Sequence, residues 1–140
     1  MGENYSCGAM TVVIDASALF AAVLPSSAHS EWAWGAIRNQ DVAAPELLSL
    51  EVTQAMRKAI LRGFVDNETG WGALSLAMSH VTEFYPHQAL IRGVWENRHQ
   101  MSAYDASYVE LARALDVPLV TLDSGLARVA HNQCTVVTPQ

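Results

Sequence analysis

The chain has 140 residues, enough for one domain with its own core, of which 51% are hydrophobic and only 16% are charged. No apolar run reaches the roughly 18 residues of a membrane-spanning helix. The two cysteines form neither a disulfide framework nor a metal motif, so a reduced cytoplasmic setting is expected. The formal net charge of -6 argues against a sequence-independent nucleic-acid binder. It does not exclude a nucleic-acid enzyme, because carboxylates that bind a metal ion are neutralised by it.

The first nine residues, MGENYSCGA, lack the basic and apolar regions of a secretory signal peptide. Gly2 and Ser6 match the short N-myristoylation pattern, but no basic cluster offers a second membrane signal. We therefore expect a disordered leader over residues 1–9, one domain over residues 10–140, and no membrane partner.

The stretch from Thr11 to Ile14 is β-branched and uncharged, which is typical of a strand buried on both faces of a parallel sheet. It ends at Asp15, and a helix-forming segment follows. Ligands of open α/β sheets lie beyond the carboxyl ends of the strands, so Asp15 is placed where such folds keep their chemistry. A helix N-cap is the other interpretation for Asp15 or Ser17, and for Asp15 taken alone it is the preferred one.

The next part of the chain is predicted to hold a helix over residues 28–37 and a short strand over residues 42–44. Pro45 then opens a long helix that ends near Arg62. Glu51 lies beside the apolar stripe of this helix, where an unpaired charge is costly. It either has a partner there or reaches water at the boundary, and the two interpretations are evenly matched.

Two further helices are predicted before residue 100. Asp66 caps the first, which turns Trp71 inward, and the second covers residues 87–98. The segment between them, residues 81–85, is an ambiguous short strand.

Asp105 is the notable residue of the helix predicted over residues 102–115. It continues the apolar stripe of that helix into its first turn, with Tyr108 three positions further on. Ser102 and Asp105 also fit a capping box, which explains an acid at this position but not its inward direction.

The arrangement of strand, aspartate and helix occurs a second time near the end of the chain. An apolar strand over residues 119–122 ends at Asp123, and a helix follows as far as Ala130. Thr121 lies on the same strand face as Asp123. An N-cap is again the alternative role for Asp123, and residues 134–137 form a plausible last strand.

Strands that alternate with helices predict an α/β fold with a mainly parallel sheet of about four or five strands covered on both faces. Asp15 and Asp123 would share its carboxyl edge, with Glu51 and Asp105 on helices docked against it. Four acids at one edge cannot all stay ionised without a cation, and Mg²⁺ or Mn²⁺ suits oxygen ligands. Spacing alone does not show that they meet.

Four segments resemble, in the same order, the successive motifs of PIN-domain ribonucleases, in particular the VapC-type toxins of toxin–antitoxin pairs. They are VVIDASAL, LLSLEVTQAMRK, YDASYVELAR and LVTLDSGLARVA, and the similarity extends from about Met10 to Pro139. The resemblance implies a catalytic, metal-binding set of four acids, supported by two hydroxyl side chains: Asp15, Glu51, Asp105 and Asp123, with Thr121 and Ser17.

The same resemblance implies a PIN-like fold and a cytoplasmic endoribonuclease. Mg²⁺ or Mn²⁺ bound by the acids would activate water for in-line attack, leaving 5′-phosphate and 3′-hydroxyl ends. It also implies a homodimer and a cognate VapB-type antitoxin, whose tail covers the groove of the toxin and places a basic side chain in the acidic site.

Three alternatives stay open at this point. The chain could be a PIN-like nuclease of RNA processing outside toxin–antitoxin pairs, or a catalytically silent module that binds a partner. A receiver-like phosphoacceptor is disfavoured, because it needs a lysine on a late strand and the only lysine is Lys58. The five histidines show no ligand spacing. The basic residues Arg57, Lys58 and Arg62 are predicted to lie on a solvated helix face, and Arg92, Arg98, His99 and Arg128 are weaker candidates for phosphate contacts.

Overall fold

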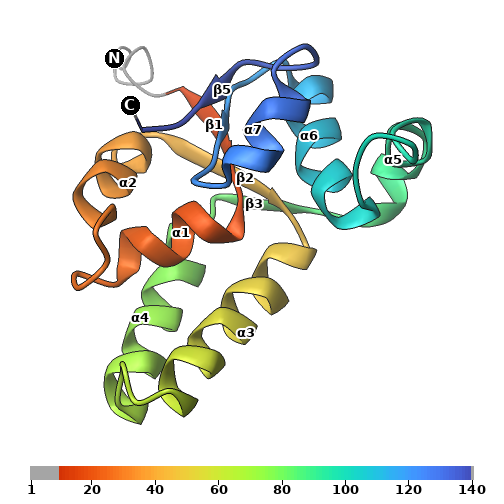
Figure 1. The fold of residues 1–140 in the computed structure, drawn as a ribbon. Helices are drawn as coiled ribbons and strands as arrows, with labels where there is room; N and C mark the ends of the chain where they lie inside the picture. Colours follow the sequence, from red (N-terminus) through yellow and green to blue (C-terminus); the bar gives the residue numbers. More distant parts are fainter. Residues whose placement is uncertain (1–9, 140) are drawn as a thin grey trace.

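The central sheet consists of five parallel strands in the order β3-β2-β1-β4-β5 (Figure 1). The structure is a computed structural model that describes residues 10–139. The prediction of a leader over residues 1–9 lies outside the described residues. The strands are β1 (Thr11–Ile14), β2 (Asp41–Pro45), β3 (Glu83–Tyr85), β4 (Leu119–Val120) and β5 (Val136–Val137).

Helices cover the sheet on both faces. The chain steps from β1 through β2 to β3 in one direction and returns to β4 and β5 on the other side of β1. Right-handed crossovers therefore place the two groups of helices on opposite faces, and Figure 1 shows α1 to α4 gathered on one side and α5 to α7 on the other. The helices are α1 (Ala16–Val23), α2 (Ser30–Ile37), α3 (Leu47–Leu61), α4 (Asn67–His80), the 3₁₀ turn η2 (His87–Leu90), α5 (Ile91–Glu96), α6 (Ala103–Leu115) and α7 (Ser124–Ala130).

The core is built around β1. This strand pairs with β2 on one side and β4 on the other, and its Val13 and Ile14 are fully buried. Burial on both faces is what the β-branched run predicts, and the predicted α/β fold is confirmed. None of the helices within residues 10–139 combines the length and the apolar character needed to cross a bilayer.

Pro45 corrects one expectation about the long helix. It is the last residue of β2 instead of the first residue of the helix, and it pairs with Tyr85 of β3. The pairing of β1 with β2 ends at Ala43, so no neighbouring strand requires the N–H that proline lacks. The helix itself begins at Leu47.

Trp71 corrects a second expectation, because it is 70% exposed instead of facing inward. Asp66 does cap this helix, as predicted, by accepting a hydrogen bond from the N–H of Thr69. The buried face of α4 consists of Gly70 and two alanines further along the helix. A methyl group on Gly70 would lie only 2.7 Å from Ile60 Cδ1, so small residues allow α4 to approach α3 and the large indole is left outside.

Candidate active site

The candidate site lies where the chain reverses its direction across the sheet. β1 is followed by α1 on one face, and the neighbouring β4 is followed by α7 on the other. Two connections that leave adjacent strands toward opposite faces open a crevice at the carboxyl edge of the sheet. Asp15 directly follows β1, and Asp123 lies at the start of α7.

Asp15 is held on both carboxylate oxygens. Its Oδ1 accepts hydrogen bonds from Ser17 Oγ at 2.7 Å and from the N–H of Ala18 at 3.0 Å, and the second of these makes Asp15 the N-cap of α1. Its Oδ2 accepts a hydrogen bond from Thr121 Oγ1 at 2.5 Å. Asp15 is only 5% exposed. The same buried carboxylate therefore caps α1 and lies in the crevice.

Two hydroxyl groups connect Asp15 to the segment after β4. Thr121 Oγ1 accepts from the N–H of Asp123 at 2.9 Å, and Ser17 Oγ accepts from the N–H of Leu122 at 3.1 Å. Each hydroxyl thus accepts a backbone N–H and gives its own proton to Asp15. The position of Asp15 is therefore determined by both sides of the crevice.

The electrostatics of the crevice oppose ionisation of its acids. Burial raises the pKa of Asp15 above its ordinary value, although the hydrogen bonds from Thr121, Ser17 and the N–H of Ala18 act in the opposite direction, and the charge of Asp123 adds to the rise. Burial also raises the pKa of Asp105, and the charges of Asp123 and Glu51 add to this effect. The carboxylates therefore lie close enough to feel one another, and a bound cation would relieve the repulsion.

Glu51 has a partner that sequence reasoning missed. Tyr108 Oη donates a hydrogen bond to Glu51 Oε1 at 2.7 Å, and the tyrosine is only 2% exposed. Burial, followed by the hydrogen bond and charge of Glu51, raises the pKa of Tyr108, so its hydroxyl remains a neutral donor. The sequence did contain an indication of this contact, because a tyrosine on a buried apolar stripe needs a hydrogen-bond partner for its hydroxyl group.

Asp123 is the exposed member of the set. Its Oδ1 accepts the N–H of Leu126 at 3.0 Å, which makes it the N-cap of α7, as the alternative interpretation proposed. Asp105 is half-buried in the first turn of α6, and its N–H donates to the hydroxyl of Ser102. The capping interaction expected for Ser102 is thus present.

One cleft of about 370 Å³ brings the predicted residues together. Ser17 and all four predicted acids line it, and Thr121 lies fully buried behind Asp15. Gln54 and Lys58 also line the cleft but were not predicted there. Their spacing was informative, because they follow Glu51 by three and seven residues and so share its helix face. The cleft is lined by Asp15, Ala16, Ser17, Glu51, Gln54, Ala55, Lys58, Asp105, Tyr108 and Asp123.

The donor chemistry of the cleft suits a hard divalent cation. Its acidic side chains offer only oxygen atoms, and among residues 10–139 neither histidine nor cysteine lines it. Within residues 10–139, no group of three or more His, Cys, Asp or Glu side chains is arranged to hold a metal ion by itself. Mg²⁺ needs only one or two carboxylates and keeps several waters. No cation of the described part of the chain forms a salt bridge with these four acids.

The chain belongs to the PIN-domain family, whose model matches residues 12–132. Within that family it is similar to ribonucleases of the VapC group, as the sequence motifs indicated. Ribonuclease VapC1 of Mycobacterium tuberculosis (strain CDC 1551 / Oshkosh) is 38% identical over 125 residues, which cover 89% of this chain and 94% of that protein. VapC ribonuclease Mb0985 of Mycobacterium bovis is 34% identical over the same share of this chain and 95% of its own length.

Two solved structures share the fold. PAE2754 from Pyrobaculum aerophilum gives a TM-score of 0.66 over 92% of both chains at 24% identity. A chain of VapBC2 from Rickettsia felis, solved bound to a DNA fragment from their promoter, gives 0.68 over 94% of this chain and 100% of its own at 13% identity. The predicted PIN-like architecture is therefore confirmed.

Proposed function

We propose that this chain is a cytoplasmic, metal-dependent endoribonuclease that acts as the toxin of a VapBC-type toxin–antitoxin pair. The observation that carries the proposal is the single cleft in which four carboxylates from separate elements come together, with Asp15 held on both of its oxygens. The VapC ribonucleases that match nine tenths of the chain support RNA as the substrate.

The cleft would hold Mg²⁺ or Mn²⁺ through Asp15 together with Glu51, Asp105 and Asp123. When bound, such an ion neutralises charge on the phosphodiester and lowers the pKa of a coordinated water. Asp15 contributes a ligand oxygen whose position is determined by Ser17 and Thr121, and Tyr108 orients Glu51.

The side chains of the cleft leave the attack to water. The hydroxyl protons of Ser17 and Thr121 already point at Asp15, and the raised pKa of Tyr108 keeps that phenol protonated. No histidine lines the cleft to serve the 2′-hydroxyl as a base. Cleavage is therefore expected to leave 5′-phosphate and 3′-hydroxyl ends instead of a 2′,3′-cyclic phosphate.

The partners follow from the same proposal. A VapB-type antitoxin would bind the toxin and block the acidic cleft, and the toxin would be a homodimer. The structural neighbour that was solved as VapBC2 on promoter DNA supports this choice of partner.

The decisive experiment is cleavage of a mixed RNA pool by antitoxin-free protein in Mg²⁺, Mn²⁺ or EDTA. We expect cutting with either metal, none in EDTA, and loss of cutting in both Asp15→Asn and Asp105→Asn. Glu68→Gln is the matched control, because it removes an exposed acid on α4 outside the cleft. Cutting in EDTA or cyclic-phosphate ends would refute the mechanism. A folded protein that fails to cut RNA in either Mg²⁺ or Mn²⁺ would favour a silent partner-binding module.

A further inference from the structure

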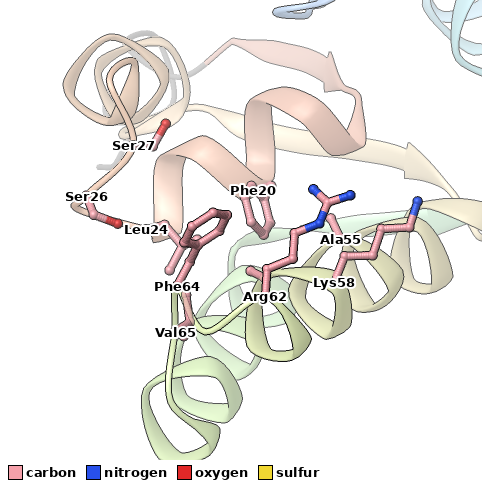
Figure 2. A pocket seen from close by; sticks show the side chains of 10 residues that line it. Phe20, Leu24, Ser26, Ser27, Ala55, Lys58, Arg62, Phe64 and Val65 are labelled. Carbon is pink, nitrogen blue, oxygen red and sulfur yellow. The ribbon is translucent and has the colours of Figure 1, made fainter.

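We infer that a groove beside the acidic cleft binds the single-stranded RNA that flanks the scissile bond, through Lys58, Arg62 and Phe64. This inference rests on the proposed ribonuclease function. The groove, here called the α3 groove, has a volume of about 640 Å³ and lies between α1, α3 and the segment that follows α3 (Figure 2).

The α3 groove adjoins the acidic cleft. Ala55 and Lys58 line both, so the two hollows are neighbours along α3. Glu51, Ala55, Lys58 and Arg62 follow one another at intervals of four, three and four residues, which places them on one face of α3. The eleven steps from Glu51 to Arg62 span about 16 Å along the helix axis. A strand whose scissile phosphate lies at the acids can therefore extend along this face.

Charge makes the α3 groove suitable for phosphate. Lys58, the only lysine of the chain, and Arg62 are both exposed, in a protein of net charge -6. Neither forms a salt bridge with a residue of the described range, although Lys58 borders the cleft of the four acids. Figure 2 shows both side chains extending from the same side of the helix, with Arg62 next to Phe20 and Lys58 further along. Two unpaired cations one helical turn apart suit successive phosphates of a strand that the carboxylates would otherwise repel.

The apolar part of the α3 groove suits bases. Phe64 is 74% exposed, and it shares the groove with Phe20 of α1. Gly63, at φ 78°, ends α3 in the left-handed conformation and turns the chain, and the N–H of Phe64 then donates to the carbonyl of Ala59 at 2.9 Å. The backbone of Phe64 is thus well placed while its ring faces solvent. Exposed aromatic rings beside cations are the usual platform for single-stranded nucleic acid, because every base has a face to stack.

None of the described residues that line the α3 groove is a carboxylate, which distinguishes it from the acidic cleft. A peptide segment would find apolar contacts there, but it would not by itself account for two unpaired cations in line with the catalytic acids. We therefore assign the groove to RNA, and the test separates this assignment from a protein occupant.

The test measures binding of a fluorescein-labelled single-stranded RNA of mixed sequence, in EDTA, across a salt series. For Lys58→Met/Arg62→Met we expect weaker binding and a slope of log affinity against log salt that is smaller by about 1.4, since each single-strand phosphate contact contributes about 0.7. Phe64→Ala should bind about tenfold more weakly through loss of stacking. Lys58→Arg should keep the slope.

Arg57→Met is the matched control. Arg57 is exposed on the same helix, next to Lys58, but it lines a different cleft with Trp71 of α4. Arg57→Met removes one positive charge, as each of the single variants Lys58→Met and Arg62→Met does, so net charge alone cannot produce a difference among these three. Its salt slope should equal that of the unmodified protein, and melting curves should show that all variants are folded.

Cleavage kinetics give a second readout. With Mg²⁺ and a long RNA, Arg62→Met, which leaves the lining of the acidic cleft intact, should raise KM and keep kcat, whereas a dinucleotide that spans only the acidic cleft should be cut equally by this variant and the unmodified protein. An unmodified protein that cuts no RNA with any metal would refute the proposed function. If the unmodified protein cuts RNA but the double variant binds and cuts long RNA as well as Arg57→Met does, this inference alone is refuted. The groove would then be assigned to a protein segment.

Discussion

Asp15 and Asp123 stand in the same local arrangement but in different surroundings. Each follows a strand and caps the next helix, Asp15 through the N–H of Ala18 and Asp123 through that of Leu126. Yet Asp15 is 5% exposed, whereas Asp123 is open to solvent. Similar segments have thus produced one buried and one exposed carboxylate.

The difference comes from what lies beside each aspartate. β1 is the central strand of the sheet, and the second oxygen of Asp15 meets Thr121 from the neighbouring segment. Asp123 Oδ2 accepts no hydrogen bond from any residue of the described range. Capping and chemistry are therefore compatible roles, and the tertiary neighbours decide how firmly a capping carboxylate is held.

The strongest test of the difference between the two aspartates compares the variants Asp15→Asn and Asp123→Asn. An amide at position 15 turns an N–H toward the hydroxyl of Thr121. The proton of that hydroxyl points at position 15, so two donors would face each other. We expect the single-turnover cleavage rate of Asp15→Asn to fall on the order of 10²–10³-fold. Asp123→Asn should lose less, because asparagine also caps helices and water replaces an exposed oxygen. Equal losses would mean that burial of Asp15 has no catalytic consequence.

Thr121 tests the connection between the two aspartates. Thr121→Val keeps the shape but leaves Asp15 Oδ2 and the N–H of Asp123 without their shared partner. The cleavage rate should fall about 10–100-fold. The free energy of unfolding, measured in urea, should fall by about 1–3 kcal/mol. Thr121→Ser is the control, since it keeps the hydroxyl and loses a methyl group worth about 0.8 kcal/mol. A valine variant as active as the serine variant would exclude the proposed positioning.

The parts of the fold that could be predicted are those written in local patterns. The β-branched run from Thr11 to Ile14 predicts a strand buried on both faces, because helices cover both faces of a parallel sheet, and Val12 to Ile14 are indeed buried. The sequence did not predict that Pro45 ends a strand, because proline is tolerated both at the start of a helix and at the end of a strand. Which of the two occurs depends on where the pairing of β1 with β2 ends, and that is set by the packing of the whole sheet.

The candidate site was predictable as elements and not as contacts. Each acid could be assigned to a strand end or a helix face, whereas the bond from Tyr108 to Glu51 joins residues 57 positions apart. Periodicity places Tyr108 on a buried face but does not say what it touches. Lys58 was assigned to a solvated face and is indeed exposed, yet the same face borders the acidic cleft. The docking of α3 against α1 and β2 brings that face to the cleft, and no local sequence pattern indicates this docking.

Tyr108 extends the comparison to the two acids on helices. Glu51 is held by Tyr108, whereas Asp105 accepts no side-chain hydrogen bond from the described residues. In Tyr108→Phe the cleavage rate should fall about tenfold, with a stability change of only about 0.5–1.5 kcal/mol. Tyr104→Phe, on the same helix and 62% exposed, should behave like the unmodified protein. An unchanged rate in Tyr108→Phe would show that Glu51 needs no positioning.

The smallest expected effect is the pH dependence of stability without metal, measured by urea unfolding in EDTA between about pH 4 and pH 7. Burial and then the charges of Asp123 and Glu51 raise the pKa of Asp105 in the folded protein. The folded state therefore holds the proton more tightly than the unfolded chain, whose aspartates titrate near about 3.9. This contribution to stability is present below that value and is lost as the pH rises through the raised pKa.

Asp105→Asn, which resembles the protonated acid at every pH, should match the unmodified protein near pH 4 and become more stable than it near pH 7. Asp66→Asn should show the opposite sign, because the hydrogen bonds of the Thr69 N–H and hydroxyl lower the pKa of Asp66. The stability it contributes is present above the unfolded pKa and lost as the pH falls. Mg²⁺ should remove the advantage of Asp105→Asn near pH 7, because the ion offsets the repulsion among the acids. A difference that does not vary with pH would show that the carboxylates of the cleft do not repel one another.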